Sequence, residues 1–491
     1  MVSRESVRIM LTYMALHEIP VLAADIRNAY LQAPTSEKHY VICGKEFGLE
    51  NEGKRAIIVR ALYGGKAAGR DFWHHLRSCM GHLGFKSKAG DPDVWMRPAI
   101  RANGSLTYEY VLLYTDDCLV IADDAESILK GEIGRYFRLK PESIGPPSLY
   151  LGGHLRQVEI DSGTLAWAFS STQYVQAAVK NVEEYMKKRG KSLSPKANDV
   201  IPKGYRPEID VTPELEPGEA SYYASLIGIL RWIVELGRVD ICTEVSMMSS
   251  HLALPRKGHL ETVFHMFAHL KKKHNSEMVF DPSYPDMDEG DFPREDWSLS
   301  IYGDVNEELP KSKPFEESGP GDMPEPRGRG FRMRVYVDCD LGGELVTRRS
   351  RTGFAVFLNN APIYWLSKKQ GSCEVSTFGS EFTAMKQAVE YVRGLRYKLR
   401  MLGIPCDEPT FVYGDNKSVL SNTTVPASTL KKKMNSLSYH FVREGCARDE
   451  WRTAYVNTND NVADLLTKPL PSGEKRNRFV RQFLYWVSSV H

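Results

Sequence analysis

The chain has 491 residues, of which 42% are hydrophobic, and its 64 Lys and Arg against 62 Asp and Glu give a formal net charge of +2. This length predicts about two to four domains. The near balance of charge does not by itself indicate a nucleic-acid-binding protein, so a basic surface has to be sought locally.

Eight cysteines are scattered through the sequence without a Cys-x-x-Cys pair. This argues against a zinc site or a disulfide framework and suits a reducing compartment. The N-terminus has no apolar signal core, and no stretch is apolar for long enough to span a bilayer. We therefore expect a soluble, intracellular protein that makes no membrane contact.

Four short basic clusters stand out, at 271–274, 348–351, 431–433 and 475–481. Each cluster alone is best explained as a solvated face. Together they fit a surface that follows phosphates, because Lys and Arg near phosphates release condensed counterions.

Three regions of the chain differ in composition and in the spacing of their apolar residues. Residues 1–280 alternate short apolar segments, predicted as strands at 21–24 and 111–114, with amphipathic segments, predicted as a helix over 221–254. Residues 281–330 are rich in Pro, Gly and acidic residues, which predicts a linker or insertion without a compact core. Alternation at 297–302 predicts one strand inside it.

A second compact unit is predicted from Phe331 onward. Residues 333–337 and 352–357 are expected as strands, a helix follows from about Ser380, another strand covers 410–413, and a last helix lies near the C-terminus. This order indicates an α/β or α+β unit.

Two adjacent aspartates, Asp116 and Asp117, follow Tyr114 between two apolar runs. The pattern predicts a strand, a tight turn and a returning strand, although a plain polar turn remains an alternative. Asp25 ends another short apolar segment. If the three carboxylates converge, each like-charged pair at about 4 Å costs about 4 kcal/mol at an effective dielectric near 20. Such a cluster favours divalent cations, and its hard oxygen ligands suit Mg²⁺.

These segments resemble the reverse transcriptases of copia-type retrotransposons. The resemblance runs from about residue 5 to 280, in family order, and is carried by Val21–Pro34, the Tyr-x-Asp-Asp box at 114–117, Ala61–Trp73, Tyr150–Gly153, Tyr223–Gly228 and Gly237–Asp240. It implies that Asp25, Asp116 and Asp117 are catalytic and hold metal ions.

The same resemblance implies roles in substrate binding. Tyr30 matches an aromatic residue that packs beneath the nucleotide sugar and excludes a 2′-hydroxyl, while an ordinary core aromatic is the alternative. Gly64 and Gly65 allow close approach of the backbone to nucleotide or template, and Lys66 and Tyr114 complete the set. Departures from the family pattern stand at Gly65, Ala67 and Gly69, where Leu, Gln and Pro are usual.

Four more acids recur in the C-terminal unit. Asp338 follows a predicted strand, Glu381 lies on a predicted helix, Asp415 follows a strand, and Asp464 is at a helix start. Any one of them alone is more often a capping or surface acid than a ligand.

Taken in order, these acids resemble the metal-binding set of the copia-type RNase H domain. The similarity covers 331 to about 475 and is carried by the segments 337–340, 352–353, 380–385, 413–418 and 463–470. It departs at Leu341, Met434 and Ser436, none of which is a metal ligand, and in the long acidic stretch 281–330. For His440 a helix-face position is the simpler interpretation, and help in product release is the alternative.

The fold class predicted is α/β and α+β multidomain. A right-hand polymerase palm with partial fingers (1–155) is followed by a helical thumb and connection (156–280), an acidic Pro/Gly-rich linker (281–330) and an RNase H-like domain (331–491). Only 24 residues precede Asp25, so we expect incomplete fingers, weak polymerase activity and a competent nuclease.

The resemblance implies an RNA-directed DNA polymerase with RNase H activity. The expected cofactor is Mg²⁺, two ions in each active site, with Mn²⁺ as the alternative. The expected partners are RNA template, DNA primer, RNA–DNA hybrid, deoxynucleoside triphosphates and other Pol or Gag segments, in the cytoplasm, a virus-like particle or the nucleus. Two alternatives stay open: a degenerate or domesticated fragment that binds nucleic acid without catalysis, and a polymerase-dead chain with a working nuclease.

Overall fold

The computed structural model describes residues 1–160, 163–303, 320–430 and 435–487. Within them lie three five-stranded sheets and one two-stranded hairpin, so the predicted mixed α/β multidomain class is confirmed. The sheet orders are β1-β7-β6-β5-β4, β17-β11-β10-β9-β8 and β14-β13-β12-β15-β16, and β2 pairs with β3.

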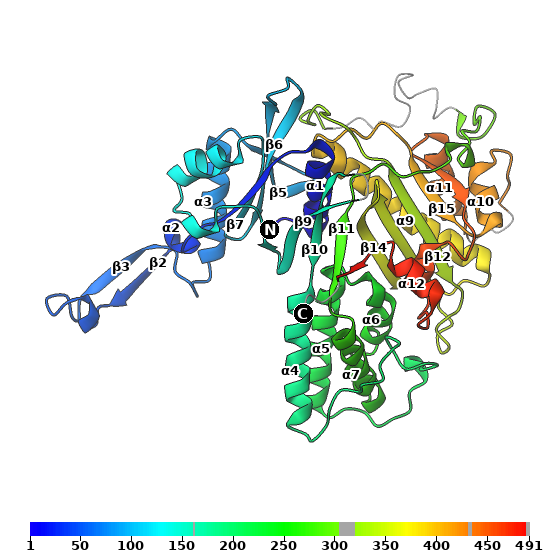
Figure 1. Cartoon of the computed structure of the whole chain (residues 1–491), viewed down its shortest axis with the longest axis horizontal. Coiled ribbons are helices and arrows are strands. Elements are labelled where there is room, and N and C mark those ends of the chain that lie inside the picture. The colour runs from blue at the N-terminus through cyan, green and yellow to red at the C-terminus, as the bar shows by residue number, and fades with distance from the viewer. Residues whose placement is uncertain (161–162, 304–319, 431–434, 488–491) are drawn as a thin grey trace.

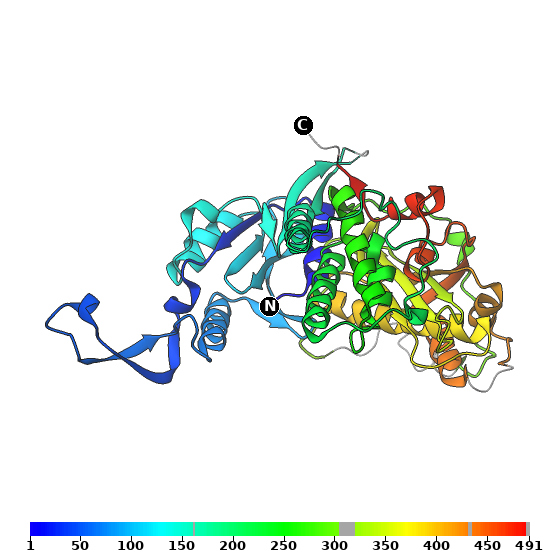
Figure 2. The same ribbon diagram turned by 90° about the horizontal axis from the view of Figure 1, so that it is seen from below.

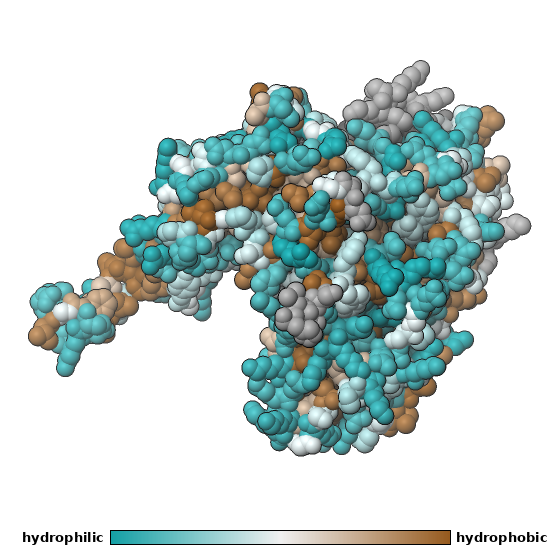
Figure 3. Space-filling model, in the orientation of Figure 1, coloured by the Kyte–Doolittle hydropathy of each residue, from teal (hydrophilic) through white to brown (hydrophobic). Residues whose placement is uncertain are grey.

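The first sheet is antiparallel throughout, and helix α3 covers one of its faces. Its strands and the elements around it are β1 (Val21–Asp25), α2 (Ala29–Gln32), β2 (Pro34–Ile42), β3 (Arg55–Arg60), α3 (Ala68–His82), β4 (Lys86–Lys88), β5 (Asp91–Ile100), β6 (Leu106–Tyr114) and β7 (Asp117–Ile121). The strands predicted at 21–24 and 111–114 are therefore confirmed. Figures 1 and 2 show the β2–β3 hairpin projecting away from the rest of the molecule, and Figure 3 shows apolar residues on its surface.

The middle of the chain combines the second sheet with four helices. These are β8 (Leu149–Tyr150), β9 (Gly153–Glu159), β10 (Leu165–Ser170), α4 (Thr172–Lys187), α5 (Pro217–Glu235), α6 (Cys242–Ser249), α7 (Lys257–Lys272) and β11 (Ser276–Phe280). The single helix predicted over 221–254 is wrong in its middle. The chain leaves α5 after Glu235, and Gly237, with a φ of 112°, begins a turn before α6.

The third sheet has β12 in its centre, antiparallel to β13 and parallel to β15. Its unit contains β12 (Met333–Asp340), β13 (Arg351–Leu358), β14 (Ala361–Lys369), α9 (Thr377–Met401), β15 (Thr410–Gly414), α10 (Lys417–Thr424), α11 (Ser436–Ala447), β16 (Trp451–Tyr455), the 3-10 helix η9 (Val462–Leu466) and α12 (Glu474–Val480). The strands and helices predicted from residue 331 onward are confirmed. The last strand, β17 (Tyr485–Trp486), leaves this unit and pairs with β11.

Helix α1 (Arg4–His17) lies between the first sheet and the third (Figure 1). All eleven residues from Ser6 to Leu16 are buried, so α1 packs on every side rather than along one stripe. Its Arg8 donates to the carbonyl of Ile363 at 2.9 Å and stacks over the Trp365 ring. Residues of the first and third sheets therefore share one hydrophobic core.

The region 281–330 is not the open linker that its composition predicts, as far as it is described. Phe292, Trp297 and Tyr302 are each at most 6% exposed and pack against the third unit. Residues 320–330 lie on the first sheet, where Arg327 donates to the carbonyl of Thr107 at 3.0 Å. The strand predicted over 297–302 is also wrong, because these residues form turns. Residues 304–319 lie outside the described part.

Candidate active sites

The first carboxylate cluster is set by strand pairing. Asp25, the last residue of β1, is the register partner of Asp117, the first residue of β7. Asp116 lies in the two-residue turn between β6 and β7, where Thr115 has a φ of 56°. The amide of Ile26 donates to the carbonyl of Asp116 at 2.8 Å and ties this turn to the end of β1. The structure thus brings all three predicted acids to one sheet edge.

A lysine that the sequence did not single out completes this cluster. Lys140 Nζ lies 2.7 Å from Asp25 Oδ2, while Asp25 Oδ1 is buried without a hydrogen-bond partner among the described residues. Burial, then the carboxylates of Asp116 and Asp25, raise the pKa of Asp117 to about 6. An orphaned carboxylate oxygen among clustered acids fits a divalent cation, since a cation satisfies both the oxygen and the repulsion.

Tyr30 lies close to this edge, on α2. It is half-buried, with its ring 4.7 Å from that of Tyr63 and 5.9 Å from that of Phe72, centroid to centroid. Tyr30 and Thr115 line a cavity of about 460 Å³, and Trp73 lines the same cavity. Tyr30 is thus accessible from a cavity beside the aspartate turn, as a residue that contacts the nucleotide requires.

The other predicted substrate-binding residues differ in placement. Tyr114 pairs with Asp117 across the hairpin, so it belongs to the cluster's edge. Gly64, Gly65 and Lys66 are exposed in the turn that precedes α3, and Gly64 has a φ of 92° that favours glycine. In the part of the chain that is described, no hydrogen bond or ion pair links these three to the aspartates, so their role stays a prediction.

The second carboxylate cluster is tighter and more buried. Asp338 of β12, Glu381 of α9 and Asp415, which follows β15, each offer an oxygen within 4.8 Å of the others. Among the described residues this is the one group of three or more potential ligands so close together. Burial raises the pKa of Asp338 to about 7, against the opposing effect of Lys468. Burial, then Asp338 and Asp415, raise the pKa of Glu381 to about 9.

These raised pKa values show that the cluster is costly without a cation. Two acids that are 2% and 9% exposed face each other, and neutral protonated forms relieve the repulsion. A divalent ion bound by the three oxygens would do the same while keeping the carboxylates ionised. The donor set, all oxygen, suits Mg²⁺.

Asp464, the fourth predicted ligand, has a different environment. Its carboxylate accepts from Lys468 Nζ at 2.7 Å and from Lys475 Nζ. Burial acts to raise the pKa of Asp464, but the two ammonium groups outweigh it and hold that pKa below its usual value. Lys468 also reaches to 3.7 Å from Asp338. The structure therefore places Asp464 beside the triad with a lysine between them.

The Thr-Gly pair at 352–353 has a steric explanation. Gly353 is the register partner of Asp338, and a Cβ at this position would lie 2.6 Å from the Thr467 side chain and 2.8 Å from Leu466. Glycine therefore lets η9 pack directly against β13. The hydroxyl of Thr467 then donates to Asp338, which holds that carboxylate in place.

Sequence reasoning missed Lys140, Lys475 and Thr467 as members of these clusters. In the sequence, Lys475 belongs to a basic cluster, and no spacing rule connects it with Asp464. His440 lies on α11 and is hydrogen-bonded at 2.6 Å to the Tyr302 hydroxyl, so it belongs to a helix face.

In the part of the chain that is described, the basic clusters are only partly exposed. Arg351 and Arg476 are buried, and Lys475 pairs with Asp464. Lys271 forms an ion pair with Glu183. Residues 431–433 lie outside the described residues.

Comparison with known proteins finds similarity along most of the chain. Residues 1–188 match the family described as reverse transcriptase (RNA-dependent DNA polymerase). The retrovirus-related Pol polyprotein from transposon TNT 1-94 of Nicotiana tabacum is 25% identical over 485 residues, which cover 97% of this chain and 32% of that protein. The corresponding polyprotein from transposon RE1 of Arabidopsis thaliana is 22% identical, with 95% and 27% covered. Along most of its length the chain is thus similar to retrovirus-related Pol polyproteins from transposons.

The similarity extends beyond plants and includes solved structures. The transposon Ty1-JR2 Gag-Pol polyprotein of Saccharomyces cerevisiae is 20% identical, with 91% of this chain and 23% of that protein covered. An RNase H1 isolated from compost (LC11-RNase H1) is 14% identical with a TM-score of 0.23, and 28% of this chain and 92% of that chain are covered. The chain spans about a third or less of the length of these polyproteins. In the described residues, no helix is long and apolar enough to cross a membrane.

Proposed function

We propose that the chain is an RNA-directed DNA polymerase with a separate RNase H site, as its sequence resemblance implies. The observation that carries the proposal is the pair of carboxylate clusters, one on the β1–β7 edge and one on β12, α9 and β15. They lie in different sheets and share no residue. Two separated metal sites fit two separate phosphoryl-transfer reactions.

The first sheet would be the polymerase palm, with residues 1–155 forming palm and partial fingers. The projecting β2–β3 hairpin would belong to the fingers, and α4 to α7 to the thumb and connection, within 156–280. Residues 331–491 would form the RNase H-like domain. The sheet of this unit supports the assignment. Its first strand in the chain, β12, lies in the centre of the strand order β14-β13-β12-β15-β16.

At the polymerase site, Asp25, Asp116 and Asp117 would hold Mg²⁺, with Mn²⁺ as the alternative. The bound ions would stabilise the attacking 3′-hydroxyl and the leaving oxygens of the triphosphate. Tyr30 would lie beneath the deoxyribose, where a 2′-hydroxyl would meet the ring. Lys140 holds Asp25 in position until the ions bind, because the ammonium supplies the charge that the cluster lacks.

At the nuclease site, Asp338, Glu381 and Asp415 would hold the cation, and Asp464 would complete the set. Thr467 orients Asp338 by donating to it. Lys468 shares its charge between Asp338 and Asp464, so it limits the repulsion within the site. The RNA strand of a hybrid would be selected by its backbone shape and 2′-hydroxyls rather than by sequence.

The partners proposed are an RNA template, a DNA primer, their hybrid and deoxynucleoside triphosphates, together with other Pol or Gag segments. The proposed location is intracellular, in the cytoplasm, a virus-like particle or the nucleus.

The test is primer extension on poly(rA)/oligo(dT) alongside cleavage of a labelled RNA–DNA hybrid, each with and without Mg²⁺. We expect both activities, and both should require the ion. Cleavage without extension would support the polymerase-dead alternative. Absence of both, in a folded protein that still binds nucleic acid, would support the non-catalytic alternative.

A further inference from the structure

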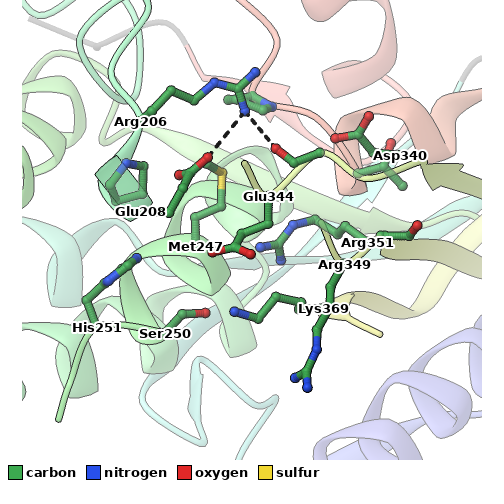
Figure 4. A pocket seen from close by; sticks show the side chains of 15 residues that line it. Arg206, Glu208, Met247, Ser250, His251, Asp340, Glu344, Arg349, Arg351 and Lys369 are labelled. Atoms are coloured by element: carbon green, nitrogen blue, oxygen red, sulfur yellow. Dashed lines mark hydrogen bonds and ion pairs between the residues drawn. The ribbon is translucent and has the colours of Figure 1, made fainter. Parts of the chain in front are cut away.

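A small pocket lies where the helical region meets the nuclease unit. Its cavity volume is about 30 Å³, and Figure 4 shows the side chains that line it. One wall comes from residues 206–208 and the end of α6. The other comes from Asp340, residues 343–344 and 349–351, Lys369, Thr467 and Pro469. Asp340 is two residues from Asp338, and Thr467 donates to Asp338, so the pocket adjoins the nuclease cluster.

The pocket contains a buried cation without a carboxylate partner. Arg351 is 9% exposed, and its Nη1 donates to the hydroxyls of Ser246 at 2.7 Å and Ser367 at 3.4 Å. In the described part of the chain, no carboxylate lies within ion-pair distance of its guanidinium. Asp340, Glu244 and Glu208 act on this guanidinium only from beyond ion-pair distance. An anion in direct contact with it would therefore be stabilising.

Two further cations reach the same pocket. Lys369, half-buried at the end of β14, forms no hydrogen bond or ion pair within the described residues, and Figure 4 shows it extending toward Ser250. Arg206, from the opposite wall, donates to the carbonyl of Gly343 at 3.1 Å and is 3.9 Å from Glu208. Arg349 also lines the pocket, but its guanidinium points away from the others (Figure 4).

Both glutamates that line the pocket accept hydrogen bonds from the surrounding loop. Glu208 accepts from the amide of Leu345 at 3.2 Å. Glu344 accepts from both the amide and the hydroxyl of Thr347. Asp340, on β12, also lines the pocket. Because N–H and O–H donors hold both glutamates, the cations retain free donor capacity toward a ligand.

We propose that this pocket binds a phosphate group of the nucleic-acid backbone next to the nuclease cluster. Lys369 and Arg351 would contact it from the nuclease side, and Arg206 from the helical side. The proposal rests on the proposed nuclease function and adds a positioning subsite to it. Because one wall belongs to residues 206–251, the helical region would help to position the hybrid for cleavage.

The experiment measures binding of an RNA–DNA hybrid by fluorescence anisotropy across a series of KCl concentrations. The full chain carries Glu381→Gln throughout, which stops cleavage. Lys369→Gln and Arg206→Gln are compared with Lys368→Gln, a matched control, since Lys368 is the exposed neighbour on β14 and does not line the pocket. Each phosphate contact contributes about 0.9 to the slope of log affinity against log salt.

We expect Lys369→Gln and Arg206→Gln each to reduce that slope by about 1, while Lys368→Gln keeps the parent slope. Lys369→Arg should restore it, and equal melting temperatures would show that the variants are folded. Equal slopes for Lys369→Gln and Lys368→Gln would overturn the proposal. A second pair of results would also overturn the proposal. If inorganic phosphate raised the melting temperature only when Lys369 is present, while hybrid binding did not depend on Lys369, the pocket would hold free anions and not a backbone phosphate.

Failure of the nuclease function itself would look different. In that case, the chain with Glu381 intact would cleave no hybrid in the presence of Mg²⁺, whatever residue stands at position 369.

Discussion

The two carboxylate clusters differ in how completely the protein has assembled them. At the proposed nuclease site, three oxygens from three elements lie within 4.8 Å of one another, and Asp338 is 2% exposed. At the proposed polymerase site the three acids lie at an open sheet edge and are half-buried. The pKa of Asp117 there rises to about 6, against about 9 for Glu381. The cluster on β12, α9 and β15 is therefore more fully assembled and more buried than the cluster on β1 and β7.

The largest expected effect is the loss of RNA cleavage in Glu381→Gln. This change removes a negative oxygen from the assembled triad, and we expect cleavage to fall on the order of 10³-fold, as for other lost transition-state contacts. Rates of hybrid cleavage measure it. Glu390→Gln, an exposed site on the same helix, is the matched control, and a similar loss there would contradict a specific role for Glu381.

At the polymerase site, Tyr30→Val should relax sugar selectivity by about tenfold or more, because a steric block of this kind contributes at least about 1.4 kcal/mol. Incorporation of a ribonucleotide relative to the matching deoxynucleotide is the measurement. Tyr40→Val, on the exposed hairpin, serves as control. Unchanged selectivity in Tyr30→Val would make Tyr30 an ordinary core aromatic.

The support of the nuclease unit by residues 281–303 can be tested through Trp297. It packs with Tyr302 and beneath Arg443, so Trp297→Ala should lower the free energy of unfolding by about 3 kcal/mol. Denaturant unfolding measures the change. Leu299→Ala, at a fully exposed position in the same segment, should change it by less than about 0.5 kcal/mol. Equal effects of the two changes would show that the segment is a linker after all.

The smallest effect concerns pH and metal. Folding raises the pKa of Asp338 from 3.8 to about 7 and that of Glu381 from 4.5 to about 9. These acids thus stabilise the metal-free protein below their unfolded pKa values, and this contribution is lost as the pH rises through the folded values. Mg²⁺ should therefore raise the melting temperature more at about pH 9 than at about pH 5, by about 4 °C or more.

In the same melting experiment, the double variant Asp338→Asn/Glu381→Gln should lose this pH dependence. Asp117→Asn should alter it less, because the folded pKa of Asp117 is only about 6. A larger change in Asp117→Asn than in the double variant would reverse the contrast between the clusters.

The close approach of Asp25 and Asp117, and most of the strands that carry the acids, could be predicted from the sequence. Asp25 and Asp117 end and begin strands whose apolar runs are visible in the sequence, and strand pairing alone brings them together. The lysines were not predictable, because Lys140 and Lys475 reach their carboxylates only through the tertiary fold. Composition also misled over 281–330, where a few aromatic residues such as Phe292 anchor a segment that is otherwise polar.

The most direct test of two separate sites is to measure both activities for Asp116→Asn and Asp338→Asn in the same preparations. We expect Asp116→Asn to abolish DNA synthesis and to leave hybrid cleavage within a few-fold of the parent, with the reverse for Asp338→Asn. Loss of both activities in either folded variant would contradict the account, because it would mean that the two clusters do not act independently.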